Sequence, residues 1–281
     1  MPGPTIRRIQ LGKELQRIRE AAGVSRLEAA AAIGCSPARI GHIEVGRNPP
    51  SKSDLIVLLR DLYRTDADAL ATLEDLRAEA SKRGWWSTYG LPEWLAGYVG
   101  LETDATSVRC LELENIPGLL QTEQYMRRLY TLDVRLSATE VKKRVPARLH
   151  RQERLIGDNP LRLTAIISQA ALERCAREKS VAAEQLAQLI DRAKLPNVEL
   201  RVLPFDLGLH VGQAGPFCLL SFPDGLLDDV AYQEYAVGGH LIDDESVVSQ
   251  LDTLFGELRS KSLDPNKSLA MIAQLAKTHG K

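Results

Sequence analysis

Histidine, cysteine and acidic side chains are the groups in this sequence that could do catalytic or metal chemistry, and their spacing argues against both. The five histidines form no His-x-His or His-Glu-x-x-His pattern, and the four cysteines form no Cys-x-x-Cys pair. No Gly-x-Ser-x-Gly nucleophile turn occurs either. We therefore expect no metal, no cofactor and no enzyme activity. The residues concerned are His42, His150, His210, His240, His279, Cys35, Cys110, Cys175 and Cys218.

Two weaker patterns leave a small-molecule-modifying enzyme as a remote alternative. His210 lies in the glycine-flanked loop 208–215, where a catalytic base could sit, although an ordinary loop histidine is the simpler interpretation. The same loop resembles a phosphate-binding loop but lacks the Lys-Ser/Thr that follows in such loops. Paired carboxylates on expected strands could do acid–base work, but they are also common on solvated sheet faces. These pairs are Glu112 with Glu114 and Asp228 with Glu234.

Charge is distributed unevenly along the chain. The 281 residues carry a net charge of −1, yet residues 1–65 hold eleven Lys and Arg against six Asp and Glu, a net of +5, which leaves −6 on the remainder. A basic module ahead of an acidic body suits an anionic partner bound at one end. At about 150 residues per domain, the length predicts two domains. The lack of a long apolar run, a signal core or paired cysteines predicts a cytoplasmic protein that does not contact membranes.

The basic segment has the periodicity of four short helices. Apolar residues recur at helical spacing over residues 11–22, and Ser25 begins a second helix with a capping box. Ser36 caps a third helix whose first turn holds Pro37, and a fourth follows over residues 51–62. Two short helices joined by a glycine turn and braced by others are typical of a helix-turn-helix.

Over Leu11–Tyr63 the sequence resembles the Cro and lambda-repressor-like (XRE) family of helix-turn-helix proteins. Each motif is weak, but the spaced set is specific. The set is Leu15-x-x-Ile18-Arg19, Gly23-Val24-Ser25, Ala30-x-x-Ile33-Gly34, Ser36-Pro37 and Ile40-x-x-Ile43-Glu44-x-Gly46-Arg47-x-Pro49. The resemblance implies that the protein binds double-stranded DNA with its third helix in the major groove.

The resemblance also implies roles for individual residues. Arg39 can donate two parallel hydrogen bonds to guanine, with a phosphate contact as the alternative, and His42 could contact a base, contact a phosphate or face solvent. Expected base contacts are Ser36, Pro37, Ala38, Arg39 and His42. Expected phosphate contacts are Ser25, Arg26, Arg47, Asn48 and Lys52, each of which could instead be a solvated surface residue.

Arg19 and Glu44 occupy positions that resemble a structural ion pair of the family, not DNA contacts. Such a pair would tie the first helix to the end of the third. Removing one partner of a buried pair costs more than the pair contributes, so a variant there should behave as a folding defect.

Residues 66–95 are expected to connect two domains, 1–65 and 96–281. A helix pattern begins near residue 65 and runs to about residue 83, and all three tryptophans of the chain follow within ten residues. These tryptophan-rich residues, 84–94, could fill part of the core of the second domain, form a dimer surface or line the wall of a ligand cavity. The interface or effector candidates are Trp85, Trp86 and Trp94.

Residues 96–281 alternate between strand and helix patterns. Strands are expected near 107–114, 161–167, 198–203, 217–222 and 230–235, with helices ending near 130 and spanning about 139–156, 181–193, 246–261 and 266–277. The expected fold class is α+β. It comprises an all-α helix-turn-helix domain of four to five helices, then a mixed α/β domain with about five strands and C-terminal helices.

The second region resembles the domain of unknown function that follows XRE-type heads in Streptomyces and other actinobacteria. Proteins of that kind are described as antitoxin-like regulators, include WhiJ-like regulators, and are often encoded beside a small partner protein. The resemblance implies partner binding. It rests on Glu114-Asn115-Ile116-Pro117-Gly118-Leu119-Leu120-Gln121-Thr122, on residues 195–205 and on Gly212-x-x-Gly215-Pro216-Phe217.

Together these patterns favour a transcription regulator that binds a palindromic DNA operator as a homodimer, associated with the nucleoid when bound. Its C-terminal domain would mediate dimerisation and bind a small protein or ligand. The alternative is an antitoxin-like protein that mainly sequesters a small partner encoded nearby, with DNA binding serving its own regulation.

Overall fold

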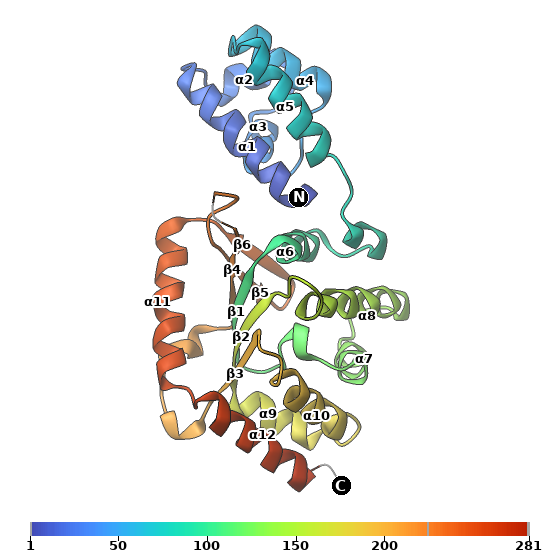
Figure 1. The fold of residues 1–281 in the computed structure, drawn as a ribbon. Helices are drawn as coiled ribbons and strands as arrows, with labels where there is room; N and C mark the ends of the chain where they lie inside the picture. Colours follow the sequence, from blue (N-terminus) through green and yellow to red (C-terminus); the bar gives the residue numbers. More distant parts are fainter. Residues whose placement is uncertain (1, 224, 280–281) are drawn as a thin grey trace. The chain divides into compact units, whose positions relative to one another are not determined.

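The computed structural model describes residues 2–223 and 225–279. The chain divides into two compact units, with the boundary between Ser87 and Thr88. The described residues form twelve α-helices and one mixed sheet of six strands (Figure 1). An all-helical unit precedes the α/β unit, which confirms the expected fold class.

The N-terminal unit has the helices that its caps predict. They are α1 (Pro4–Ala21), α2 (Arg26–Ala32), α3 (Pro37–Glu44), α4 (Lys52–Ile56), which continues as a π-helical turn (Val57–Leu62), and α5 (Ala67–Ala80). The Ser25 hydroxyl accepts the Glu28 backbone N–H and the Glu28 carboxylate reaches back to Ser25, which confirms the predicted capping box. The Ser36 hydroxyl caps α3 in the same way, at the Arg39 N–H.

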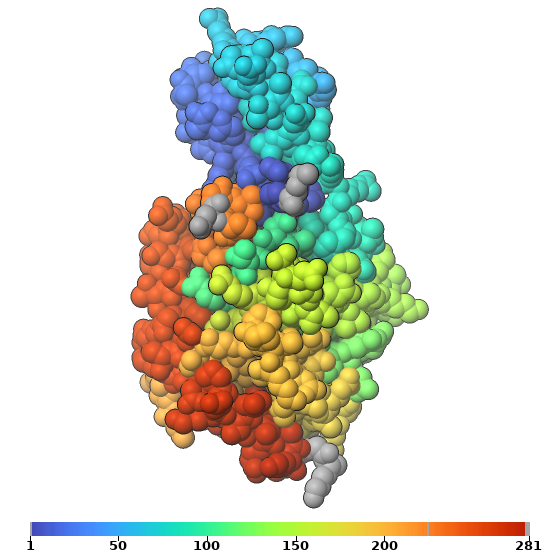
Figure 2. Space-filling model, viewed as in Figure 1, coloured from blue at the N-terminus to red at the C-terminus, as the bar shows by residue number. Residues whose placement is uncertain are grey.

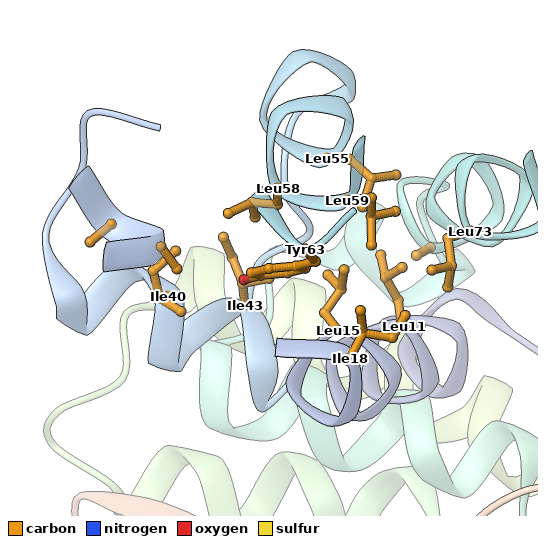
Figure 3. Close-up of a cluster of buried hydrophobic side chains, with 13 residues drawn as sticks. Leu11, Leu15, Ile18, Ile40, Ile43, Leu55, Leu58, Leu59, Tyr63 and Leu73 are labelled. Carbon is orange, nitrogen blue, oxygen red and sulfur yellow. The ribbon is translucent and has the colours of Figure 1, made fainter. Parts of the chain in front are cut away.

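One hydrophobic core holds these helices together (Figure 3). The predicted apolar face of α1 meets Ile40 and Ile43 from α3, with Tyr63 between them in the view of Figure 3. Leu73 and Ala80 of α5 belong to the same core. The helix expected within a connecting segment is therefore the fifth helix of the N-terminal unit.

The C-terminal unit is built on a sheet with strand order β3-β2-β1-β4-β5-β6. The first three strands are parallel, and β4, β5 and β6 run antiparallel to their neighbours. The strands are β1 (Ser107–Glu112), β2 (Arg162–Ser168), β3 (Val198–Leu203), β4 (Phe217–Ser221), β5 (Val230–Tyr235) and β6 (Gly238–Ile242).

Helices lie on both faces of this sheet, and its central strands are largely buried. In Figure 1, α11 lies along one face and α6, α7 and α8 lie on the other. Figure 2 shows α12, in red, at the surface beside the gold segment of α10, which it contacts. The helices are α6 (Glu93–Asp104), α7 (Glu123–Leu132), α8 (Ala138–Gln152), α9 (Gln169–Arg177), α10 (Ala182–Arg192), α11 (Glu245–Lys261) and α12 (Pro265–His279).

Three of these elements were not expected from the sequence: α6, α9 and β6. The strand β6 begins with two glycines, which strands disfavour, and it forms because β5 offers it a complete edge of hydrogen-bonding groups. The other five strands lie within about two residues of their predicted positions. Helix α8 contains Pro146 and continues through it without a break.

Candidate nucleic-acid interface

The recognition face of α3 is set by what the helix buries. Ile40 and Ile43 are only 2% and 3% exposed, so the core fixes the rotation of α3 about its own axis. The opposite side and the N-terminal turn face solvent. All five predicted base contacts lie there and are exposed: Ser36, Pro37, Ala38, Arg39 and His42.

The turn before α3 gives that face its position. Gly34 adopts φ +63°, a left-handed conformation that suits glycine, and it ends α2 with a sharp change of direction. Ser36 then caps α3, and Pro37 occupies the first turn, where its missing N–H costs no hydrogen bond. The N-terminal turn of α3 is therefore presented at the surface.

Arg39 forms an ion pair that the sequence did not predict. Its Nη2 atom lies 2.7 Å from Oδ2 of Asp54, on α4. The Arg39 side chain remains 47% exposed. This bond uses one of the five N–H groups of the guanidinium, and two others suffice for a bidentate contact with guanine. Asp54 can thus orient the arginine while its outer edge stays available.

The five predicted phosphate contacts fall into two groups. Arg47 and Asn48 lie exposed in the turn after α3. The other three lie in α2, in α4 and at the cap of α2. Ser25 completes its capping box, Arg26 Nε lies 2.7 Å from Glu44 Oε2, and Lys52 Nζ lies 3.1 Å from Glu74 Oε2. The Arg26 and Lys52 side chains are 49% and 62% exposed, so both keep surface that DNA could contact.

Arg19 and Glu44 form the ion pair that the resemblance implied. Arg19 Nε lies 2.5 Å from Glu44 Oε1, and Nη2 lies 3.3 Å from Oε2. A third bond, of 2.8 Å, joins Nη1 to the carbonyl oxygen of Val24. Both side chains are at least 92% buried, and the bond to Glu44 raises the pKa of Arg19 although burial opposes this. The pair therefore ties α1 to the C-terminal end of α3.

The tryptophans of the strip 84–94 are not all in one place. Trp85 and Trp86 lie in a 3-10 turn (Trp85–Tyr89), with ring centroids 6.0 Å apart in an edge-on arrangement. Trp94 belongs to α6, in the C-terminal unit. Trp86 is buried, whereas Trp85 and Trp94 are partly exposed.

Over residues 2–223 and 225–279, no three His, Cys, Asp or Glu side chains come together in a way that could hold a metal ion. Within those same ranges, no helix has the length and apolar character needed to cross a membrane.

Comparison with protein families gives two matches. Residues 10–73 match a helix-turn-helix domain, which covers α3 and the buried Arg19–Glu44 pair. Residues 95–274, well over half of the chain, match the domain of unknown function DUF5753. No curated protein and no solved structure matches this chain significantly. The helix-turn-helix match identifies a DNA-binding regulator. The chain belongs to the DUF5753 family and carries a helix-turn-helix domain ahead of that region.

Proposed function

We propose that this protein is a sequence-specific regulator of transcription that reads double-stranded DNA with α3. One observation carries the proposal: the core buries Ile40 and Ile43 and thereby turns an arginine-bearing face of α3 to solvent. In a helix-turn-helix the leading residues of this helix enter the major groove. Arg39 would read guanine, and the phosphate contacts would supply most of the affinity.

Replacement of Arg39 tests the base-reading part. The wild-type, full-length protein is first used to select its preferred duplex from a randomised pool of DNA sequences. Arg39→Ala is then expected to bind that duplex about 1–3 kcal/mol more weakly and to lose its preference at one G·C pair, because a bidentate arginine–guanine contact disappears. Binding is measured by gel shift, and selectivity by repeating the selection with the variant.

Arg17→Ala is the matched control, because Arg17 is an equally charged, 67% exposed residue of α1 that pairs with Glu14. It should leave both affinity and selectivity close to wild type. If Arg39→Ala selects the same sequence as wild type with the same stringency, Arg39 does not read a base.

Arg47 tests the phosphate part. Arg47→Gln is expected to weaken binding to all duplexes to a similar extent and to lower the slope of log affinity against log salt by about one, because one fewer counterion is released. The measurement is a gel-shift series between about 50 and 200 mM salt on preferred and unrelated duplexes. An unchanged slope, or a loss confined to one sequence, would assign Arg47 another role.

We further propose that the protein acts as a homodimer on a palindromic operator, with the C-terminal unit mediating dimerisation and binding a small ligand or protein. One helix-turn-helix buries little surface, so two copies on half-sites roughly 34 Å apart, or a multiple of this, are needed for useful affinity. Solution mass with and without the selected duplex tests this. A monomer in both conditions would end it.

The resemblance to antitoxin-like, WhiJ-like regulators of actinobacteria supports a small protein partner encoded by a neighbouring gene. Co-expression of that gene product with the full-length chain, followed by purification through a tag on one of them, tests the partnership. We propose that the protein works by binding DNA and partners and is not an enzyme. His210 is not among the residues that line the pocket described below.

A further inference from the structure

A pocket of about 380 Å³ lies within the C-terminal unit, on the face of the sheet opposite α11. Strand alternation separates the two faces. Leu111, Leu219 and Ala231 point to the core that includes α11, whereas their neighbours along the strands line the pocket. The volume falls in the range of small-molecule sites, which are mostly apolar with a few polar groups.

The floor of the pocket brings together residues from strands far apart in the sequence. Cys110 and Glu112 of β1 and Tyr232 and Glu234 of β5 all line it. Glu234 lies close enough to Glu112 to disfavour a negative charge on Glu112. Glu114, which the sequence suggested as the partner of Glu112, instead pairs with Arg174 and is 64% exposed.

Residues 115–119 and 121 form the rim of the pocket, and they belong to the motif 114–122 on which the resemblance of this unit to its family rests. Glutamines hold its backbone. Gln121 Nε2 donates to the carbonyl oxygen of Ile116 at 2.7 Å, and Gln152 Nε2 donates to that of Gln121 at 2.7 Å. Gln185 binds both the N–H of Thr122 and the carbonyl oxygen of Leu120. Buried bonds of this kind fix the rim before any ligand arrives.

The positive side chains that line the pocket are already engaged. Arg151 makes two bonds of 2.7 Å to Glu102, and Arg135 makes bonds of 2.7 and 2.8 Å to Asp133. Arg148 donates to Gln121 Oε1 at 2.6 Å and lies over the ring of Tyr130.

The two carboxylates that line the pocket differ from its arginines. Within the ranges that the structure describes, neither Glu112 nor Glu234 has a lysine, arginine or histidine nitrogen within 4.0 Å. Burial, together with Glu234, raises the pKa of Glu112 to about 8, against an opposing effect of Arg148. The surroundings of Glu112 thus disfavour a negative charge on it, and a cation bound in the pocket would favour that charge.

We propose that this pocket binds a small organic molecule with a protonated amine, whose ammonium group contacts Glu112 and whose apolar or aromatic body lies against Tyr98 and Tyr232. The centroids of these two rings are 4.3 Å apart, and their planes are inclined by 31°. A carboxylate and tyrosine faces together favour an ammonium group over a neutral or anionic one. The inference deepens the proposed function and rests on it, because it names the ligand class of the C-terminal unit.

Matched fragments test the chemistry directly. The full-length chain is titrated with 2-phenylethylamine, 2-phenylethanol and 3-phenylpropionate, and with hexylamine, hexanol and heptanoate, by ligand-observed NMR. The amines are expected to bind about tenfold or more tightly than their partners, because a charge-assisted hydrogen bond to Glu112 forms only with them. Glu112→Gln should abolish that preference, whereas Glu114→Gln, two residues along the chain, should preserve it.

The variant is designed to keep its fold, because glutamine has the shape of the protonated carboxyl that burial favours. Its melting temperature is recorded and compared with that of Glu114→Gln, whose side chain lies outside the pocket lining. Tighter binding of the acids, equal binding of the alcohols, amine selectivity that survives Glu112→Gln, or no binding of either amine would each overturn the proposal. Gel shifts on the same preparations, without fragments, report separately on DNA binding.

Discussion

A chain carrying Glu44→Gln is expected to lose roughly 3–5 kcal/mol of stability in its N-terminal unit, because the buried Arg19 loses its buried counter-charge. Glu44 is 3% exposed and accepts bonds from both Arg19 and Arg26. The packing around Glu44 leaves little room for a water molecule to take the place of its carboxylate. A Cβ added at Gly12 would lie 2.4 Å from the Glu44 carbonyl oxygen, which shows how closely α1 packs against the end of α3.

The effect is measured by hydrogen–deuterium exchange of the full-length chain, since peptides from residues 2–87 and from the C-terminal unit report separately. Exchange should accelerate throughout the first group and stay unchanged in the second. Glu20→Gln is the matched control. Glu20 pairs with the same Arg19 but is 56% exposed, so its loss should cost less than about 1 kcal/mol.

DNA binding distinguishes this defect from loss of a contact. Glu44→Gln should weaken binding to all duplexes in proportion to the unfolded fraction and recover at lower temperature or with added osmolyte. Arg39→Ala should not recover in this way. Normal exchange in the Glu44 variant together with lost DNA binding would mean that Glu44 acts at the interface and not in the fold.

The second large effect is expected in the C-terminal unit, at the pair Glu102–Arg151. Both bonds of this bidentate pair are 2.7 Å long, and the side chains are 1% and 8% exposed. The guanidinium also lies 5.2 Å from the ring centroid of Tyr98. Glu102→Leu should therefore cost roughly 3–5 kcal/mol, because it leaves a buried arginine whose remaining surroundings are largely apolar or aromatic.

A double variant tests whether the cost comes from the uncompensated charge. Glu102→Leu with Arg151→Leu should be more stable than Glu102→Leu alone, since an apolar pair of similar volume needs no counter-charge. Chemical denaturation of the wild type, Glu102→Leu, Arg151→Leu and the double variant gives the coupling free energy between the two residues. If the two single losses simply add in the double variant, the residues stabilise the unit independently and not as a pair.

The sequence by itself determined the elements whose signals are local. The Ser25 and Ser36 caps, the glycine at 34 and the spacing of Leu11, Leu15 and Ile18 each act within one or two turns of chain, so the helices of the DNA-binding unit could be predicted from them. The exposed face of α3 could be predicted from the same kind of local signal. Five strands were predictable because their apolar alternation is local as well.

Only the tertiary structure decided which groups meet. Asp54 of α4 pairs with Arg39 of α3. Glu234 of β5 comes close enough to affect the charge of Glu112 of β1, because the strand order in the sheet differs from the order in the chain. The strand β6 likewise exists because β5 supplies its partner. The physical reason is common to all three. Ion pairing, burial and strand pairing depend on distances in space, and a sequence pattern with a period of two or 3.6 residues encodes no such distance.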